Sequence, residues 1–198
     1  KFVRNAAKYL HQKKFPSILM KIDISKLFDT LSWEFLLEIL KIRSFGHRWC
    51  SWICGLLTTA CSSVLINGET TSSFALGKGV RQGDPLSPAL FILGMDALQA
   101  MLNWAARQKL LAKIALDSRT PRACIFADDV VLFFSPDTTD LQVISTILEL
   151  FGDASGLRIS FQKSTITCIQ CGEDKAAEVA DFLHCQNLKF PFKYLGLP

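Results

Sequence analysis

The sequence has no uninterrupted apolar run of the about 18–20 residues that a membrane span needs, because Gly, Ser, Asp or Lys interrupts each candidate. It has no initiator Met, no signal peptide, no internal repeat and no Pro- or Ser-rich linker. Seven Cys, an odd number in apolar surroundings, argue against a secreted disulfide framework and for a reducing compartment. We therefore expect an intracellular domain that has no membrane partner and is an internal piece of a longer chain.

The composition is that of a folded domain. Of the 198 residues, 49% are apolar, 20% are charged and 15 are Phe, which suffices for a sizeable core. The net charge of +4 is uneven, because residues 1–48 hold ten Lys and Arg against four Asp and Glu. A basic leading segment suits contact with a polyanion, although an ordinary solvated face is at least as common. The charge distribution alone therefore does not decide whether the chain binds a polyanion.

Hydrophobic periodicity predicts helices and strands in alternation. Helices are expected over 2–14, 32–43, 47–60, from Ser87 as N-cap onward, from about 138 to Gly156, and over 173–185. Strands are expected over 17–25, 123–127, 130–134, within 158–170 and over 190–195, with a hairpin of 63–66 and 72–76 across Asn67-Gly68. The β-α-β-β-α-β order of the central elements predicts an α+β fold, a split βαβ (ferredoxin-like) antiparallel sheet with helices packed on one face.

Two adjacent carboxylates, Asp128 and Asp129, lie between apolar strands and are expected at a hairpin tip. Their mutual repulsion and the nearby apolar surface both disfavour ionisation, and a divalent cation would remove both penalties. Asp is also a favoured turn residue, so two solvent-facing turn residues are the simpler alternative for this pair alone.

Asp23 lies on the polar face of the predicted strand 17–25, where Asp is disfavoured. An ion pair with Lys21, two residues away on that face, is one explanation. If this strand lies beside the 123–134 hairpin, Asp23 and Asp128 converge. Carboxylates from two strands can hold two Mg²⁺ ions for in-line phosphoryl transfer.

The segment Gly79–Pro88 is the third candidate. Its glycines permit close approach to a flat ligand, and Arg81 and Gln82 supply forked hydrogen-bond donors. A structural loop with an exposed Arg is the alternative.

Five ordered blocks together resemble the palm motifs of reverse transcriptases, and are nearest to those of non-LTR (LINE-type) retrotransposons. They are Lys21–Asp29, Gly79–Pro88, Phe126–Asp129, Gly156-Leu157 with Lys163-Ser164, and Tyr194-Leu195-Gly196. The resemblance spans about residues 18–196. It implies a polymerase palm that adds dNTPs to a DNA primer 3′-hydroxyl on an RNA template. The implied cofactors are two Mg²⁺ ions, for which Mn²⁺ can substitute.

The resemblance also implies individual roles. The implied metal ligands are Asp23, the backbone carbonyl of Ile24, Asp128 and Asp129, with Asp129 less directly bound. Phe28 is similar to the aromatic residue that stacks under the incoming sugar and excludes a 2′-hydroxyl. The remaining implied roles are nucleotide and template contacts at Arg81, Gln82 and Gly83, protonation of the leaving pyrophosphate by Lys163, and a primer grip at Tyr194, Leu195 and Gly196.

Two positions depart from the family pattern. Leu27 stands where Ala is common, and its larger side chain would displace the Phe28 ring. Ser160 stands where Asn is usual, which removes an amide that could brace the Lys163 strand. Both departures bear on how well the implied site is assembled.

By the same resemblance, residues 1–198 are a partial palm. Fingers motifs are expected before residue 1, a thumb after residue 198, and an endonuclease elsewhere in the same polyprotein. Such truncation favours a second hypothesis, a decayed, non-catalytic retrotransposon remnant that folds and binds nucleic acid. The intact Asp23, Asp128, Asp129 and Gln82 favour the enzyme. Because such elements integrate into chromosomal DNA, nuclear access is implied.

Cys168 and Cys171 have the spacing of half a zinc knuckle, and His184-Cys185 follows downstream. A continuous strand would place residues three apart on opposite faces. We therefore expect core packing here rather than a zinc site.

Overall fold

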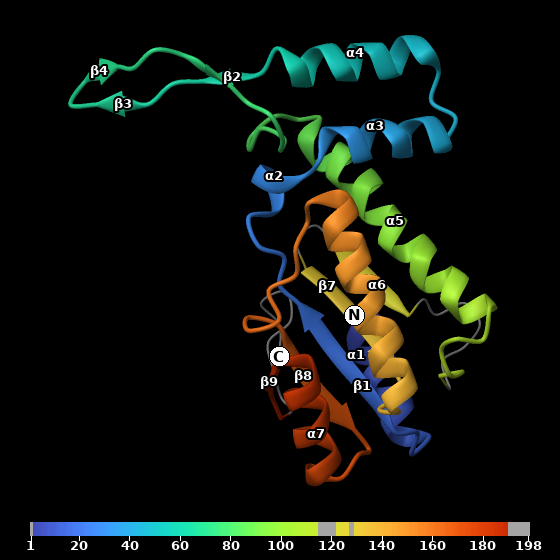
Figure 1. The fold of residues 1–198 in the computed structure, drawn as a ribbon. Coiled ribbons are helices and arrows are strands. Elements are labelled where there is room, and N and C mark those ends of the chain that lie inside the picture. Colours follow the sequence, from blue (N-terminus) through green and yellow to red (C-terminus); the bar gives the residue numbers. More distant parts are fainter. Residues whose placement is uncertain (1, 115–121, 127–128, 190–198) are drawn as a thin grey trace.

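A five-stranded sheet forms the centre of the protein (Figure 1). The computed structural model describes residues 2–114, 122–126 and 129–189. The strand order is β6-β7-β1-β8-β9. These strands are β1 (Ser17–Ile22), β6 (Ala123–Phe126), β7 (Asp129–Phe134), β8 (Thr165–Ile169) and β9 (Gln186–Asn187). β1 is antiparallel to both β7 and β8, β6 is antiparallel to β7, and β9 runs parallel to β8.

The described part of the chain has seven helices. They are α1 (Phe2–Gln12), α2 (Leu27–Thr30), α3 (Trp33–Ile42), α4 (His47–Thr58), α5 (Ser87–Arg107), α6 (Thr138–Ser155) and α7 (Glu173–Leu183). The positions of all but α2 follow the periodicity of the sequence. The helices α5 and α6 pack against each other and share one apolar core with β1 and β7 (Figure 1).

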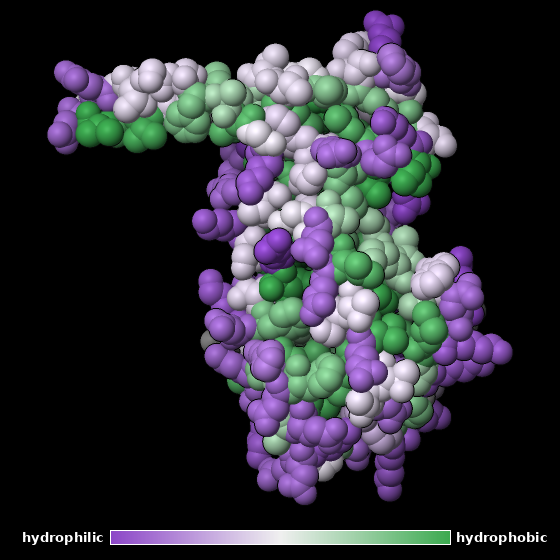
Figure 2. All heavy atoms as spheres, viewed as in Figure 1, coloured by the Kyte–Doolittle hydropathy of each residue, from purple (hydrophilic) through white to green (hydrophobic). Residues whose placement is uncertain are grey.

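A narrow arm projects from the end of α4 (Figure 1). It consists of β2 (Cys61–Ser62) paired with β5 (Phe74–Ala75), and β3 (Leu65–Ile66) paired with β4 (Glu69–Thr70). The expected turn is confirmed, because Asn67 and Gly68 both have positive φ. Every residue from 61 to 75 is exposed, and apolar surface gathers along the arm and on α4 (Figure 2).

Helices cover both faces of the sheet, so the expectation of one covered face is wrong. Alternate residues of β1 enter separate cores: Ile18, Met20 and Ile22 pack with α5 and α6, whereas Leu19 packs with α1. The second face also carries Val131, Phe133 and Ile169. An apolar second face needs its own cover, and the buried stripe of α1 (Val3, Ala6, Ala7, Leu10) provides it.

Two expected boundaries also change. The regular part of β1 ends at Ile22, and beyond it Ile24 makes only an isolated bridge with Ile159. Ser87 is the first buried residue of α5 rather than its N-cap. The Asp84 carboxylate accepts a hydrogen bond from the backbone N–H of Leu86 instead, at 2.8 Å.

The helix α5 corrects the expectation that no segment is a candidate membrane span. By length and mean hydropathy it is apolar enough to cross a bilayer. Its buried side chains, among them Phe91, Met95 and Leu98, belong to the same core as the sheet. Core packing therefore accounts for part of its hydropathy, while Ile92 and Trp104 remain exposed.

The short helix α2 and the residues after it are held between two other backbone segments. On one side, Gly79 donates to the Leu31 carbonyl at 2.8 Å and Val80 donates to the Phe28 carbonyl at 2.6 Å. On the other side, Ser32 donates to the Ser155 carbonyl at 2.7 Å. This segment carries Phe28, so its anchoring fixes one wall of the candidate site.

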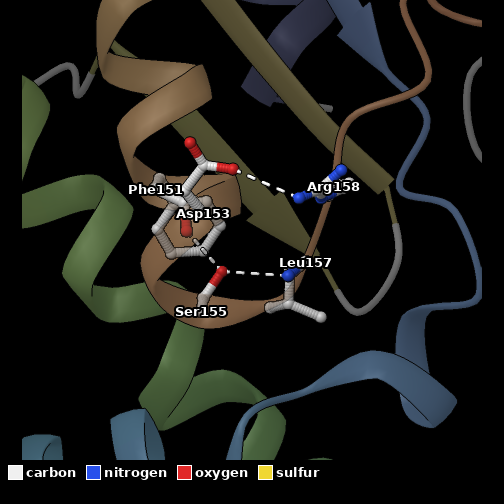
Figure 3. Close-up of polar contacts among 5 residues, drawn as sticks. All are labelled: Phe151, Asp153, Ser155, Leu157 and Arg158. Atoms are coloured by element: carbon white, nitrogen blue, oxygen red, sulfur yellow. Dashed lines mark hydrogen bonds and ion pairs between the residues drawn. The ribbon is translucent and has the colours of Figure 1, made fainter.

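Glycine is required at both contacts. Gly79 has φ +82°, and a Cβ there would lie 2.7 Å from the Asp29 carbonyl oxygen. Gly156 has φ +77° as the C-cap of α6, and a Cβ there would overlap the Thr30 carbonyl oxygen. Figure 3 shows the adjoining end of α6, where the Ser155 hydroxyl accepts from the Leu157 N–H at 3.1 Å and donates to the Phe151 carbonyl at 2.6 Å.

Substitution of either glycine by alanine should destabilise the fold. We expect Gly79→Ala and Gly156→Ala each to lower the free energy of unfolding by about 3 kcal/mol, because strained φ and a backbone clash add. Equilibrium urea unfolding measures this. Gly55→Ala is the matched control, since a Cβ at Gly55 meets nothing within 4 Å, and it should be neutral or stabilising in the middle of α4. Equal midpoints for Gly156→Ala and the unsubstituted chain would contradict the close approach.

Candidate active site

Asp23 and Asp129 come from the same end of two adjacent central strands. Ile22, the last residue of β1, is paired with Val130 of β7. Asp23 directly follows Ile22, and Asp129 directly precedes Val130. Two of the three predicted carboxylates are thus brought to one edge of the sheet. Asp128, the third, lies outside the described residues.

The Asp129 carboxylate pairs with Lys21, at 2.9 Å between Oδ1 and Nζ. Their side chains are 21% and 36% exposed, so the pair is partly shielded from water. The alternative of an ion pair between Lys21 and Asp23 is therefore wrong, because Lys21 forms its ion pair with Asp129. The sequence analysis did not predict the pairing of Lys21 with Asp129. The position of Lys21 on the polar face of the strand was the signal that could have indicated it.

The Asp23 side chain is exposed, whereas both of its peptide groups are bonded. Its N–H donates to the Ser164 hydroxyl at 3.0 Å, and its carbonyl accepts from the Ser160 N–H at 2.9 Å. Among the described residues, no group forms a hydrogen bond or ion pair with the Asp23 carboxylate. The backbone is held and the charged group remains available.

Ile24 is buried and forms the bridge with Ile159. The hydrogen bonds of this bridge are made by the Asp23 carbonyl and the Ser25 N–H. The Ile24 carbonyl, predicted as a backbone ligand, is therefore not used by the bridge.

The Phe28 ring packs against Phe91 of α5, with ring centroids 5.7 Å apart at 47°. Both rings line a mainly apolar cavity of about 670 Å³ between α5 and β6. Leu27 is buried in the main core. The Leu27 side chain thus points into the core, and the Phe28 ring lines the cavity.

The loop after Gly79 presents its polar residues to solvent. Arg81, Gln82 and Gly83 are exposed, and Gly83 has φ +87°. The preceding Val80 is buried and bonded to the Phe28 carbonyl. In addition, the Trp33 indole N–H donates to the Gly79 carbonyl at 2.6 Å. The exposed donors are therefore anchored next to Phe28.

Lys163 is exposed in a tight turn, where its N–H donates to the Ser160 carbonyl at 3.1 Å. Ser160 braces this turn through its backbone carbonyl, which any residue at this position would supply. The predicted primer-grip residues Tyr194, Leu195 and Gly196 lie outside the described residues.

A known protein family matches nearly the whole chain. The family described as "Reverse transcriptase (RNA-dependent DNA polymerase)" matches residues 2–198. The chain belongs to this family.

Two curated relatives are named as proteins of transposable elements. The chain is 28% identical over 190 residues to the "Retrovirus-related Pol polyprotein from type-1 retrotransposable element R2" of Popillia japonica, covering 90% of this chain and 30% of that protein. It is 28% identical over 165 residues to the "Transposon TX1 uncharacterized 149 kDa protein" of Xenopus laevis, covering 82% of this chain and 12% of that protein. The resemblance to reverse transcriptases of non-LTR retrotransposons is confirmed.

A solved structure shares the fold. The apo telomerase from Candida tropicalis, truncated from its C-terminal domain, superposes with a TM-score of 0.60 over 86% of this chain and 35% of that chain. The sequence identity is 15%, so this likeness concerns the mixed helix-and-sheet fold alone.

The donor set of this member of the family fits a hard divalent cation. Asp23 and Asp129 offer carboxylate oxygens and Ile24 offers a carbonyl oxygen, the ligand types that Mg²⁺ prefers. In the described ranges, no group of three or more His, Cys, Asp and Glu side chains is placed to hold a metal ion. A ligand group that includes Asp128 lies partly outside those ranges.

The zinc alternative at Cys168 finds no further ligands in the described ranges. The two thiols nevertheless lie together, contrary to the expectation of opposite faces. β8 ends at Ile169, and Gln170 has φ +57°, which turns the chain back. A hydrogen bond with the Cys168 thiol lowers the pKa of Cys171 to about 7 and raises the pKa of Cys168. The Cys171 thiol also lies within hydrogen-bond distance of the Ile169 and Ser17 carbonyls, at 3.3 and 3.6 Å, and both cysteines pack against the main core.

Proposed function

We propose that this chain is the palm of an RNA-directed DNA polymerase that adds dNTPs to a DNA primer on an RNA template. The observation that carries the proposal is the pairing of Ile22 with Val130, which brings Asp23 and Asp129 to one sheet edge. The antiparallel order β6-β7-β1-β8 supports a split βαβ palm, because the last strand of a β-α-β-β-α-β chain lies beside the first.

Asp23, the Ile24 carbonyl, Asp128 and Asp129 would hold the divalent ions, two Mg²⁺ or their Mn²⁺ substitutes. Bound there, the ions would lower the pKa of the primer 3′-hydroxyl and stabilise the leaving pyrophosphate. Asp129 is already neutralised in part by Lys21. This ion pair supports a less direct role for Asp129 than for Asp23.

The remaining residues orient the substrates and transfer a proton. Phe28 lies under the incoming sugar, where its ring leaves no room for a 2′-hydroxyl, and Phe91 supports the ring from below. Arg81, Gln82 and Gly83 contact the nucleotide and the template base. Lys163 donates a proton to the pyrophosphate oxygen as the bond to the α-phosphorus breaks.

The context of the palm is part of the proposal. The chain spans 30% or less of the two curated relatives described above, so fingers, thumb and endonuclease would come from flanking segments of one polyprotein. Access to the nucleus would follow from integration into chromosomal DNA.

The metal-binding roles predict unequal effects of two substitutions. Asp23→Asn should abolish primer extension, because one metal-binding charge disappears. The loss should exceed the about hundredfold cost of removing a group that only hydrogen-bonds to a metal ligand. Asp129→Asn should cost about tenfold, since Lys21 already shares that charge. The measurement is Mg²⁺-dependent extension of a DNA primer on an RNA template, with the chain alone and extended at both ends by its own neighbouring coding sequence.

Asp153→Asn is the control, because Asp153 lies on the exposed surface of α6 in a 3.4 Å pair with Arg158 (Figure 3). It should leave extension unchanged. Full activity of Asp23→Asn would refute the assignment of this carboxylate. Absence of extension in every version, with intact folding, would support the non-catalytic remnant instead.

The position of Phe28 predicts sugar selectivity. Phe28→Val should raise incorporation of ribonucleotides relative to deoxynucleotides by at least about tenfold, because the smaller side chain admits the 2′-hydroxyl. The ratio of kcat/KM values for rNTP and dNTP measures this. Phe35→Val is the matched control, since Phe35 packs edge-on against Phe151 at 6.2 Å, away from the cavity wall. Unchanged selectivity in an active Phe28→Val protein would exclude the role.

A further inference from the structure

Ser164 is a fully buried polar residue next to the candidate site. Its side chain is 0% exposed. Its hydroxyl oxygen accepts the Asp23 N–H at 3.0 Å, and its O–H donates to the Ser160 carbonyl at 2.8 Å. Both hydrogen-bonding functions of the hydroxyl are therefore used. A buried, satisfied hydroxyl fixes the groups that it joins.

The hydroxyl replaces a missing bond of the sheet. Pairing of β1 with β8 ends at Lys21 and Thr165. Before Thr165 the chain forms a turn, in which the N–H groups of Lys163 and Ser164 both donate to the Ser160 carbonyl, at 3.1 and 2.8 Å. The turn has no backbone carbonyl bonded to Asp23, and the Ser164 side chain supplies the acceptor.

The same turn holds the other peptide group of Asp23, because the Ser160 N–H donates to the Asp23 carbonyl at 2.9 Å. The backbone of Asp23 is thus fixed on both sides by one short segment. Fixing the backbone fixes the direction of the Cα–Cβ bond and, with it, the region that the carboxylate reaches. Lys163 lies in this segment, one peptide bond from Ser164.

We propose that Ser164 is the positioning residue for the Asp23 carboxylate and that its hydroxyl sets the placement of Asp23 relative to Lys163. The inference rests on the proposed polymerase function. Loss of the hydroxyl leaves the Asp23 N–H without its acceptor and frees the backbone at the metal-binding residue. The turn of residues 160–164 then no longer carries Lys163 in a fixed relation to that carboxylate.

The test compares Ser164→Ala with a closely matched control, Ser155→Ala. Ser155 is also 0% exposed, and its hydroxyl likewise accepts a backbone N–H and donates to the carbonyl four residues earlier (Figure 3). Both variants lose the same two hydrogen bonds. They differ in that only Ser164 is bonded to Asp23. Ser164→Thr, which keeps a hydroxyl, is the conservative variant.

The first readout does not depend on activity. Amide hydrogen exchange at Asp23, measured by NMR without metal, should accelerate at least about tenfold in Ser164→Ala, because the N–H has lost its acceptor. It should stay within about twofold of the parent in Ser155→Ala and Ser164→Thr. Unchanged exchange at Asp23 in Ser164→Ala would overturn the proposal.

The second readout is primer extension. In Ser164→Ala, kcat should fall and the Mg²⁺ concentration for half-maximal rate should rise, each about tenfold or more, with KM for dNTP nearly unchanged. Ser155→Ala keeps the backbone carbonyl that accepts the Ser32 N–H, so it should keep the parent kcat. Ser164→Thr should recover most of the parent kcat. An active parent with equal kcat in Ser164→Ala and Ser155→Ala would refute the positioning role alone. Absence of extension in a folded parent, both alone and extended at both ends by its flanking segments, would refute the polymerase function itself.

Discussion

Three backbone segments meet around α2 so closely that only glycine fits at two of the contacts, and the site is built on this junction. Gly79 brings the loop with Arg81 and Gln82 against the Phe28 carbonyl, and Gly156 brings the end of α6 against Thr30. These backbone contacts allow little lateral adjustment, because any added Cβ would overlap a carbonyl group. The aromatic wall, the polar loop and the end of α6 therefore form one rigid unit.

The end of β1 adds the charged part of the site to this unit. On the β7 side, Lys21 holds the Asp129 carboxylate, and on the β8 side, the turn of residues 160–164 holds the Asp23 backbone. One acid is thus restrained through its charge and the other through its peptide groups. This difference leaves the Asp23 carboxylate exposed to a cation, which suits the unequal roles proposed for the two acids.

Much of the local structure could be predicted from the sequence. The alternation of Ile18, Met20 and Ile22 indicated a strand with one core face, and Gly156 ended α6 in the left-handed conformation, as expected. The predictions failed where the decisive partner is distant in sequence. The cover of the second sheet face by α1, the reversal of the chain at Gln170 and the pairing of Lys21 with Asp129 all depend on such partners.

The sequence by itself determined the family, the order of the elements and the identity of the acidic and aromatic residues, because these reside in local patterns and motif spacing. Only the tertiary structure decided which acid Lys21 neutralises, why positions 79 and 156 are glycine, and that the Ser164 hydroxyl bonds to Asp23. The physical reason is that hydrogen bonds, ion pairs and steric limits act between atoms close in space. The register of β1 against β7 and β8 brings Lys21 to Asp129 and Asp23 to Ser164, each from a position more than a hundred residues away.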